Sequence, residues 1–545
     1  MSETGTNLIS SINKSGSGVD LANLVDGLVK AETDSKQKLI TKKIESANLQ
    51  ISSFGQLSSK LSSFSSSLTN IENTNSRSVT NSGTAASLIV TNEASAQDIN
   101  TDISISSTAK GQVVTYDLTH ASLLNSNTLS SASTIPQGSL TFTIAGVNNT
   151  ITVNSSNNSV QGLVNAINAV TGAEATLVDT TGSGGLALVI KSDTGTSNAF
   201  SLSSSDGLSA FSTSGMNSSS TPITLSVAAS DAVFKVDGLT VTRSGNTITD
   251  IFDGYTLDIN STSSGTFNIQ SSVSPTDARD RMQQFVDSIN DVKTYLLTET
   301  KRGIDGADDG SLVGDVAANQ VLRELNAITT REIVGYSANS HYLSNLGVQT
   351  ERDGSISLNL EKFNAAIAAN PDLINIVFGS IYSTNSDVLK LSGPKNFPPV
   401  AGSYNFSYTS GGSATLNGET ISPLLNSSNN KVFTGKSGDT KNLSVELLSD
   451  ITTSATVRYG ESLIEKLQKY VSDITSSTGV IKTRTTALNT ELQGYDDEQS
   501  DLESKITSLT AAYNEKFGAM ETLVTQLNKT GEYLTSLMDA WNKKE

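Results

Sequence analysis

Both ends of the chain carry apolar residues at helical spacing. Residues 20–71 contain no proline and only two glycines, and their apolar positions alternate by three and four residues. This is the heptad pattern of a coiled coil, with one extra step of three at Phe54. We therefore predict one long N-terminal coiled-coil helix over residues 19–79. The positions predicted for its apolar face are Ile44, Ile51, Phe54, Leu57, Leu61, Phe64 and Leu68.

The C-terminal segment, residues 458–545, repeats this pattern. Gly494, Gly518 and Gly531 weaken a helix here without forbidding it. We predict a second coiled-coil helix, and Trp541 near its end is either a core residue or an anchor for a partner. The predicted apolar positions are Leu488, Leu492, Leu502, Ile506, Leu509, Phe517, Met520, Leu523 and Leu527.

Between the two ends, residues 80–273 change to the two-residue alternation of β-strands. Residues 140–153 alternate around Asn148 and Asn149, which is typical of a hairpin. Residues 175–178 and 186–190 flank a glycine-rich turn in the same way, and a short helix is expected over 160–170. The prediction is a set of β-rich middle domains, with a smaller domain inserted at about 138–205.

Helical spacing returns at Ser274 and Pro275, which are good helix-start residues. Residues 274–384 are predicted to form a helical domain that packs with the termini and includes a hairpin turning at Asp353 and Gly354. A further β-rich insert follows at 385–457. The predicted fold class is α+β multidomain, with paired N- and C-terminal coiled-coil helices forming a helical stalk and β-rich domains inserted between them.

The terminal apolar stripes are incomplete. Ser58, Ser65 and Gln499 occupy positions where a regular heptad frame asks for apolar residues. Because burial along one such stripe does not offset the cost of ordering a long helix, we expect the arms to fold fully only against other subunits or partners. An autonomous hairpin of the two helices within one chain remains the alternative.

Composition excludes most chemistry. The 545 residues carry 36 basic and 54 acidic side chains, a net charge of −18, which disfavours nucleic acid and anionic membranes as partners. There is no cysteine, and the two histidines, His120 and His341, are far apart, so thiolate sites, zinc sites and a Ser-His-Asp relay are improbable. We predict no enzyme activity, no catalytic residue, no metal and no cofactor.

One acidic loop is a candidate calcium site. It contains Asp305, Asp308, Asp309 and Asp315, but the EF-hand spacing fails because Ala307 and Val316 fall at ligand positions. Asp308 and Asp309 as an acid–base pair lack any sign of burial that would split their pKa values. Gly182 to Gly185 lacks the lysine of a phosphate loop. We expect ordinary loops at both places.

The N-terminus shows no charged and apolar segment of the secretory type, and no run of residues is apolar enough to insert in a membrane. The chain is therefore expected to stay in the cytosol or to leave by a route that does not read such a signal.

Several segments together resemble the family of the bacterial flagellar filament-capping protein, flagellar hook-associated protein 2. The most specific are residues 15–32 with 51–61 at one end, and 513–528 at the other. Further similar segments follow in the family's order, at 234–250, 276–297, 312–315, 347–358 and 370–379. Residues 160–168 with 186–192 are similar to a small repeat that capping proteins share with some flagellins.

This resemblance implies a secreted structural cap at the distal end of the filament, which retains exported flagellin and promotes its folding and polymerisation during elongation. Implied partners are the chain itself, in a ring-shaped homo-oligomer expected to be a pentamer, flagellin and the filament tip, the hook–filament junction proteins, and a flagellar export chaperone at the C-terminal helix. Export would use the flagellar type III apparatus, with residues 1–18 as a disordered export and hinge segment.

Other hypotheses about the function remain open. Another flagellar axial protein, a flagellin or a junction protein, would share the polar composition and paired terminal helices. The Ser/Thr/Asn-rich β domains also suit a surface adhesin or a carbohydrate-binding module. A glycosidase or other hydrolase is poorly supported.

Overall fold

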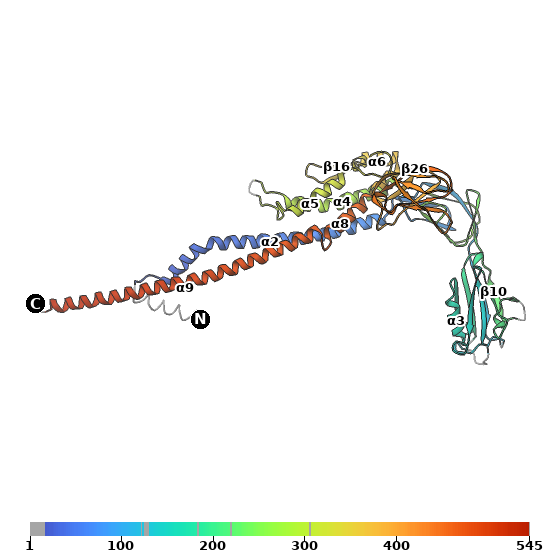
Figure 1. The fold of residues 1–545 in the computed structure, drawn as a ribbon, viewed down its shortest axis with the longest axis horizontal. Coiled ribbons are helices and arrows are strands. Elements are labelled where there is room, and N and C mark those ends of the chain that lie inside the picture. Colours follow the sequence, from blue (N-terminus) through green and yellow to red (C-terminus); the bar gives the residue numbers. More distant parts are fainter. Residues whose placement is uncertain are drawn as a thin grey trace.

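The computed structural model describes residues 17–120, 122–124, 130–182, 185–217, 221–304 and 307–543. The molecule is elongated, with a helical stalk at one end, a head at the other, and a separate β-rich unit beyond the head (Figure 1). The stalk consists of α2 (Leu21–Asn73) and α9 (Val480–Asn542), which lie side by side, and the end of α9 continues past the start of α2. The pairing of two long terminal helices is thus confirmed, while their coiled-coil geometry stays a prediction.

Helix α2 begins where Asp20 accepts a hydrogen bond from the backbone N–H of Asn23 at 3.1 Å. Toward its C-terminal end the buried positions follow one another at steps of three and four without interruption. The prediction that Ser58 and Ser65 interrupt the buried face is therefore wrong. Ser58 is exposed and Ser65 is half-buried, because the extra step of three after Phe54 shifts the buried positions away from both serines. The buried residues in this part are Phe54, Leu57, Leu61, Phe64, Leu68 and Ile71.

A helical unit packs around this end of α2. Ser274 caps its first helix with Pro275 at the first position, as the sequence predicts, and Asp315 caps the second. A hairpin turns at Asp353 and Gly354, where Gly354 has φ 89°. The elements are α4 (Pro275–Thr300), α5 (Val316–Thr330), β16 (Val348–Thr350), β17 (Ile356–Leu358), α6 (Leu360–Ala369), α7 (Asn375–Phe378) and α8 (Leu463–Thr475). Together with α2 and the first turns of α9 they enclose one hydrophobic core.

Next to this core lies a first β unit with its own hydrophobic centre around Phe234 and Ile269. One sheet has the order β1-β15-β3-β11-β12 and a smaller one the order β13-β14-β2, and both are antiparallel. The strands are β1 (Arg77–Asn81), β2 (Ala86–Val90), β3 (Ile99–Ser107), β11 (Ala232–Val236), β12 (Leu239–Arg243), β13 (Thr247–Ile248), β14 (Tyr255–Ile259) and β15 (Phe267–Val273).

A second β unit is inserted between β3 and β11 and has a separate core around Tyr116 and Phe142. Its sheets have the orders β10-β4-β8-β7 and β6-β5-β9. Its elements are β4 (Gly111–Asp117), β5 (Gly138–Ile144), β6 (Val147–Val153), α3 (Val160–Asn168), β7 (Ala173–Asp179), β8 (Leu186–Thr194), β9 (Phe200–Ser203) and β10 (Ile223–Val227).

In this unit the hairpin turn predicted at Asn148 and Asn149 is wrong. The chain turns at Ala145 and Gly146, which have φ values of 51° and 76°, and the two asparagines pair with Thr143 and Phe142 in the ladder. Two consecutive residues with positive φ match the right-handed twist of the strands, which is why the turn forms there.

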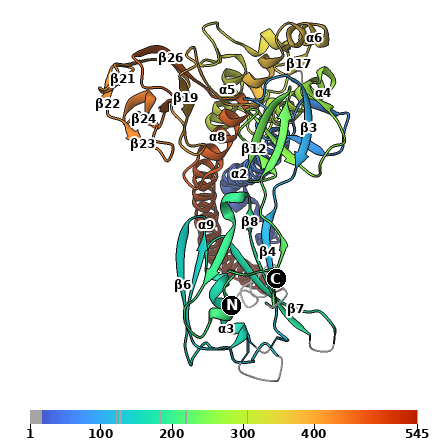
Figure 2. The same ribbon diagram turned by 90° about the vertical axis from the view of Figure 1, so that its right-hand side faces the viewer.

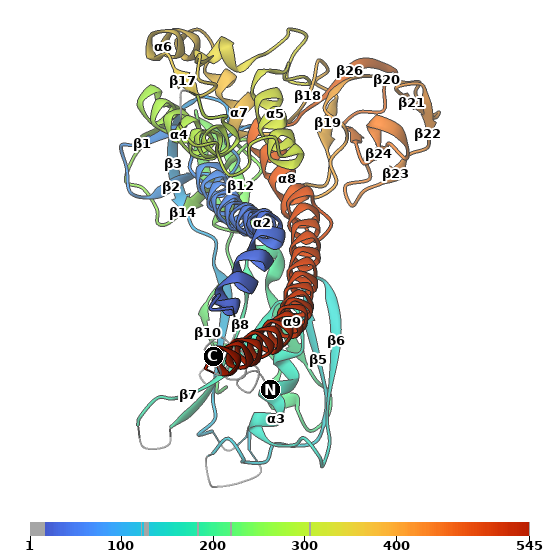
Figure 3. The same ribbon diagram turned by 90° about the vertical axis from the view of Figure 1, so that its left-hand side faces the viewer.

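A third β unit, the insert, leaves the head after α7 and returns at α8. Its sheets have the orders β18-β26-β20-β21-β22 and β19-β25-β24-β23, packed over Phe406 and Phe433. The strands are β18 (Ile381–Thr384), β19 (Leu389–Ser392), β20 (Gly402–Tyr408), β21 (Ala414–Leu416), β22 (Glu419–Ile421), β23 (Leu424–Leu425), β24 (Lys431–Thr434), β25 (Ser444–Leu447) and β26 (Thr453–Gly460). Viewed along the stalk, the insert and α6 lie on opposite sides of the head (Figures 2 and 3).

Candidate interaction surface and stalk–head junction

The residues predicted for the coiled-coil and oligomer interface fall into three groups. Seven are buried within the chain, namely Phe54, Leu57, Leu61, Phe64, Leu68, Leu488 and Leu502. Six are half-buried along the two helices, namely Ile44, Ile51, Leu492, Ile506, Leu509 and Phe517. Three are exposed near the end of α9, namely Met520, Leu523 and Leu527. The structure therefore brings most of them together inside one subunit and leaves the last three uncovered.

The exposed group continues to the C-terminal end of α9. Leu527, Leu534 and Trp541 are 63%, 56% and 79% exposed, and they are spaced seven residues apart. Leu523 lies four residues before Leu527, and Leu537 lies three residues after Leu534, so both share this face, since residues three and four apart are helix neighbours. We call this row the distal stripe. Trp541 belongs to it, so it is not a core residue of the subunit.

Polar contacts hold α2 along α9. Ser17 donates from its backbone N–H and its hydroxyl to Glu521, which is fully buried. Further along, Lys505 pairs with Glu32 at 3.2 Å and Lys43 with Glu498 at 3.6 Å. These contacts run antiparallel and place the start of α2 at Glu521, so that the distal stripe lies mostly beyond α2. Of the predicted segment 1–18, residues 1–16 lie outside the described residues.

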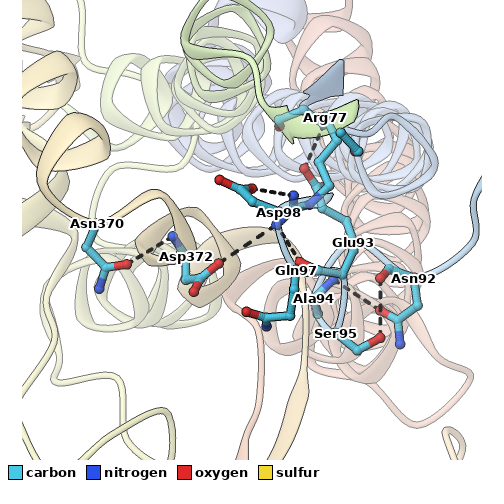
Figure 4. Close-up of polar contacts among 12 residues, drawn as sticks. Arg77, Asn92, Glu93, Ala94, Ser95, Gln97, Asp98, Asn370 and Asp372 are labelled. Carbon is cyan, nitrogen blue, oxygen red and sulfur yellow. Dashed lines mark hydrogen bonds and ion pairs between the residues drawn. The ribbon is translucent and has the colours of Figure 1, made fainter. Parts of the chain in front are cut away.

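At the other end of α2, two buried arginines join the stalk to the head. Arg77 at the start of β1 pairs with Asp98 at 2.8 Å, approaches Asp372 to 4.0 Å and donates to the backbone oxygen of Ala96 (Figure 4). Asn370 accepts from the backbone N–H of Asp372 at 3.1 Å and fixes that turn. Arg77 thus ties β1 to the loop after β2 and to the turn before α7.

Arg281 on α4 is the second of these arginines. Its guanidinium donates to the backbone oxygen of Ile71 at 2.9 Å and of Glu72 at 3.3 Å, at the end of α2, and forms an ion pair with Glu93. The ring of Phe378 lies 4.2 Å from the guanidinium carbon. A cation at these carbonyls is favourable because the C-terminus of a helix carries partial negative charge.

A cleft of about 480 Å³ opens beside this junction, between the end of α2, the loop after β2 and the start of the insert. Lys395 of the insert reaches across it to Glu72 at 2.8 Å, and Gln468 of α8 donates to the same carboxylate at 2.9 Å. These partners lower the pKa of Glu72 although its burial opposes that shift. The cleft is therefore lined by groups that are already paired with one another.

The acidic and histidine side chains considered as chemical groups take part in local contacts where the structure describes them. Within the described ranges, no group of three or more His, Cys, Asp or Glu side chains could hold a metal ion, and Asp305 lies outside those ranges. Asp315 is buried as the cap of α5 and pairs with Arg484 at 2.7 Å. His120 and His341 each contact a serine hydroxyl at 2.8 Å. No helix in the part of the chain that the structure describes is long and apolar enough to cross a membrane.

The junction residues carry almost no recognisable signal in the sequence. Arg77, Glu93 and Arg281 come from three separate segments, and no motif connects them. The one available signal was Arg281 itself, a charged residue between Ala278, Met282 and the rest of the apolar face of its helix.

Comparisons with known proteins agree with this architecture. The family model described as flagellar hook-associated protein 2 C-terminus matches residues 229–529, and the one described as flagellar hook-associated protein 2 N-terminus matches residues 17–112. The flagellar hook-associated protein 2 of Escherichia coli O157:H7 is 25% identical over 533 residues, covering 95% of this chain and 96% of the relative. The B-type flagellar hook-associated protein 2 of Pseudomonas aeruginosa is 25% identical over 405 residues, with 70% and 82% covered.

Among solved structures, the D1-D2-D3 domains of the flagellar cap protein FliD from Escherichia coli match with a TM-score of 0.53 and 20% identity. The match covers 80% of this chain and 99% of that one. It shows that the two share a fold.

Proposed function

Because the chain belongs to the flagellar hook-associated protein 2 family, whose C-terminal model alone matches more than half of it, we propose that the stalk and head form the structural cap at the distal end of the bacterial flagellar filament. The cap retains exported flagellin, promotes its folding and polymerisation, and is needed for filament elongation. This function uses binding surfaces and no catalysis.

The observation that carries the proposal is the position of the distal stripe. Leu523, Leu527, Leu534, Leu537 and Trp541 lie at the end of the stalk that points away from the head. Exposed apolar rows of this kind mark interaction sites in proteins. A stalk end with such a row can pack into the filament end, while the broad head remains outside and closes it.

The partners follow from this arrangement. The cap binds further copies of itself and flagellin at the filament tip. We propose in addition that the ring is a pentamer, that an export chaperone covers the distal stripe before export, and that the cap first assembles on the hook–filament junction proteins. An amphipathic helix with an uncovered apolar face suits recognition in a groove of a chaperone.

We also propose export through the flagellar type III apparatus and action outside the cell. An extended, mostly helical stalk with small separate β cores suits passage as an unfolded chain followed by refolding.

The test is complementation of cells that lack the gene. We expect such cells to release unpolymerised flagellin into the medium and to grow no full filaments, and the full chain to restore filaments and clear the medium. A chain that ends at residue 522, and so lacks the whole distal stripe, should fail to restore filaments even where it reaches the medium. Normal filaments in the deletion strain would contradict the cap function.

A further inference from the structure

The stalk carries opposite charges at one level. Residues 36–43 of α2 contain four lysines and no acidic residue, and residues 496–503 of α9 contain five carboxylates and no basic residue. The pairs Lys43–Glu498 and Lys505–Glu32 show that these two segments lie at the same height along the stalk.

Much of this charge has no ion-pair partner in its own chain. Lys43 pairs with Glu498, and Lys38 with Asp34 at 2.7 Å. Lys36 and Lys42 are exposed and take part in none of the ion pairs formed by the described residues. The same holds on α9 for Asp497 and Asp501.

Each set forms a surface of its own. On α2, Leu39 is 56% exposed and lies one turn from Lys36 and one turn from Lys42, and we call these three residues the basic face. On α9, Asp497 and Asp501 are four residues apart and form the acidic face. Like charges at this spacing destabilise a helix, so a cation from elsewhere would relieve the repulsion between the two aspartates.

If the copies form a ring, its symmetry limits which residues of a neighbouring copy can supply a cation to the acidic face. Copies related by rotation about an axis parallel to their stalks keep every residue at its own height, so only features at the same level can meet. A contact between two different surfaces closes into a ring when the rotation closes. The basic face on α2 and the acidic face on α9 satisfy both conditions.

We propose that the basic face of one copy docks against the acidic face of the next copy, and that this contact joins the stalks of neighbouring subunits in the ring. The inference rests on the proposed function, which requires a ring of copies. Leu39 supplies the apolar part of the contact, and Lys36 and Lys42 meet Asp497 and Asp501. Because exposed charges are screened within about 8 Å at physiological ionic strength, the contact weakens with salt.

The absence of cysteine makes a direct test possible. Leu39→Cys and Ser500→Cys are combined in the full chain, which leaves all charges in place, and the protein is oxidised. A disulfide between copies gives a ladder of covalent multimers on a denaturing gel, whereas each single variant lacks the ladder. A monomer band with no free thiol would show a bond within one chain and would overturn the proposal.

Charge reversal tests the same contact by another route. Lys36→Glu with Lys42→Glu, or Asp497→Lys with Asp501→Lys, should each raise the concentration needed for assembly about tenfold, measured by sedimentation at low salt. All four changes together should restore assembly, because opposite charges meet again. Lys436→Glu with Lys441→Glu in the insert reverses two exposed lysines that take part in none of the ion pairs formed by the described residues. It is the matched control and should assemble like the unchanged chain.

The outcomes distinguish a failure of the docking contact from a failure of the proposed cap function. If the unchanged chain forms rings and both reversed variants form them equally well, the docking contact is wrong and the cap function stands. If the unchanged chain stays monomeric at every concentration, the ring that the proposed function requires fails as well.

Discussion

The guanidinium of Arg281 forms an ion pair with the carboxylate of Glu93, and the two side chains are only 3% and 11% exposed. The pair lies where α2 ends and the head begins, and Arg281 also binds the last carbonyl groups of α2. Glu93 in turn accepts from the backbone N–H of Ser76 at 2.7 Å, directly before β1. One buried pair therefore fixes the direction in which the stalk leaves the head.

Arg281→Met should destabilise the chain strongly. It leaves Glu93 buried without its counter-charge and removes hydrogen bonds from Ile71 and Glu72, and breaking one partner of a buried pair costs about 3–5 kcal/mol. The free energy of unfolding, measured by urea denaturation, gives the result. Adding Glu93→Gln to Arg281→Met should recover part of the loss, since the buried charge is then gone. Equal stability of the single and double variants would contradict the role of the pair.

Lys293→Met should stabilise the chain. Lys293 on α4 is fully buried, and its ammonium has no hydrogen-bond partner. Burial lowers its pKa, and the charge of Asp353 only partly opposes this shift. A methionine of similar shape removes the buried charge, and this typically raises the free energy of unfolding by about 1–3 kcal/mol. Thermal unfolding compared with the exposed control Lys469→Met measures the difference, and a lower Tm for Lys293→Met would refute it.

The same residue predicts a pH dependence. Since the pKa of Lys293 is lower in the folded chain than in the unfolded chain, the unfolded state binds more protons between the two values. Stability from this group therefore rises with pH across that interval and is complete above the ordinary value of about 10.5. The rise should be missing from Lys293→Met, as urea denaturation from neutral to alkaline pH can show.

In the insert, the charge of Asp450 should contribute to the stability of the folded chain, and this contribution should be lost in acid. Lys431 and the hydroxyl of Tyr408 bind its carboxylate and lower its pKa to about 2. Because the folded pKa is depressed, the contribution is present above the ordinary value near 3.8 and disappears as the pH falls toward 2. NMR titration of Asp450 should show its midpoint move upward in Lys431→Met and stay in place in Lys441→Met.

Much of the fold follows from local sequence signals. Ser274 with Pro275, and Asp353 with Gly354, mark element boundaries correctly because capping and turn geometry depend on a few neighbouring residues. The hairpin at Ala145 and Gly146 was misplaced because asparagines also favour turns, and only the pairing of both strands decides between the two positions.

The sequence does not predict which part of each apolar stripe is buried within the subunit and which part is exposed. Leu57 and Leu527 both belong to the apolar stripes of their helices, yet Leu57 is fully buried and Leu527 is 63% exposed. Periodicity gives the apolar face of a helix but not the length over which a partner covers it. That length depends on where α2 begins, which the contact of Ser17 with Glu521 fixes across 504 positions of sequence.

This division leads to a paired prediction about the two leucines. Leu527→Ser should leave the Tm of the purified chain nearly unchanged, because the side chain is mostly exposed, and it should reduce filament length in complemented cells. Leu57→Ser should instead cost about 2–5 kcal/mol of stability, since it removes a fully buried side chain from the core shared by α2 and the head. Circular dichroism melts and filament lengths from electron microscopy measure the two effects separately. If Leu527→Ser lowered the Tm as much as Leu57→Ser, the distal stripe would be part of the subunit core, and the proposal that it binds the filament end would be wrong.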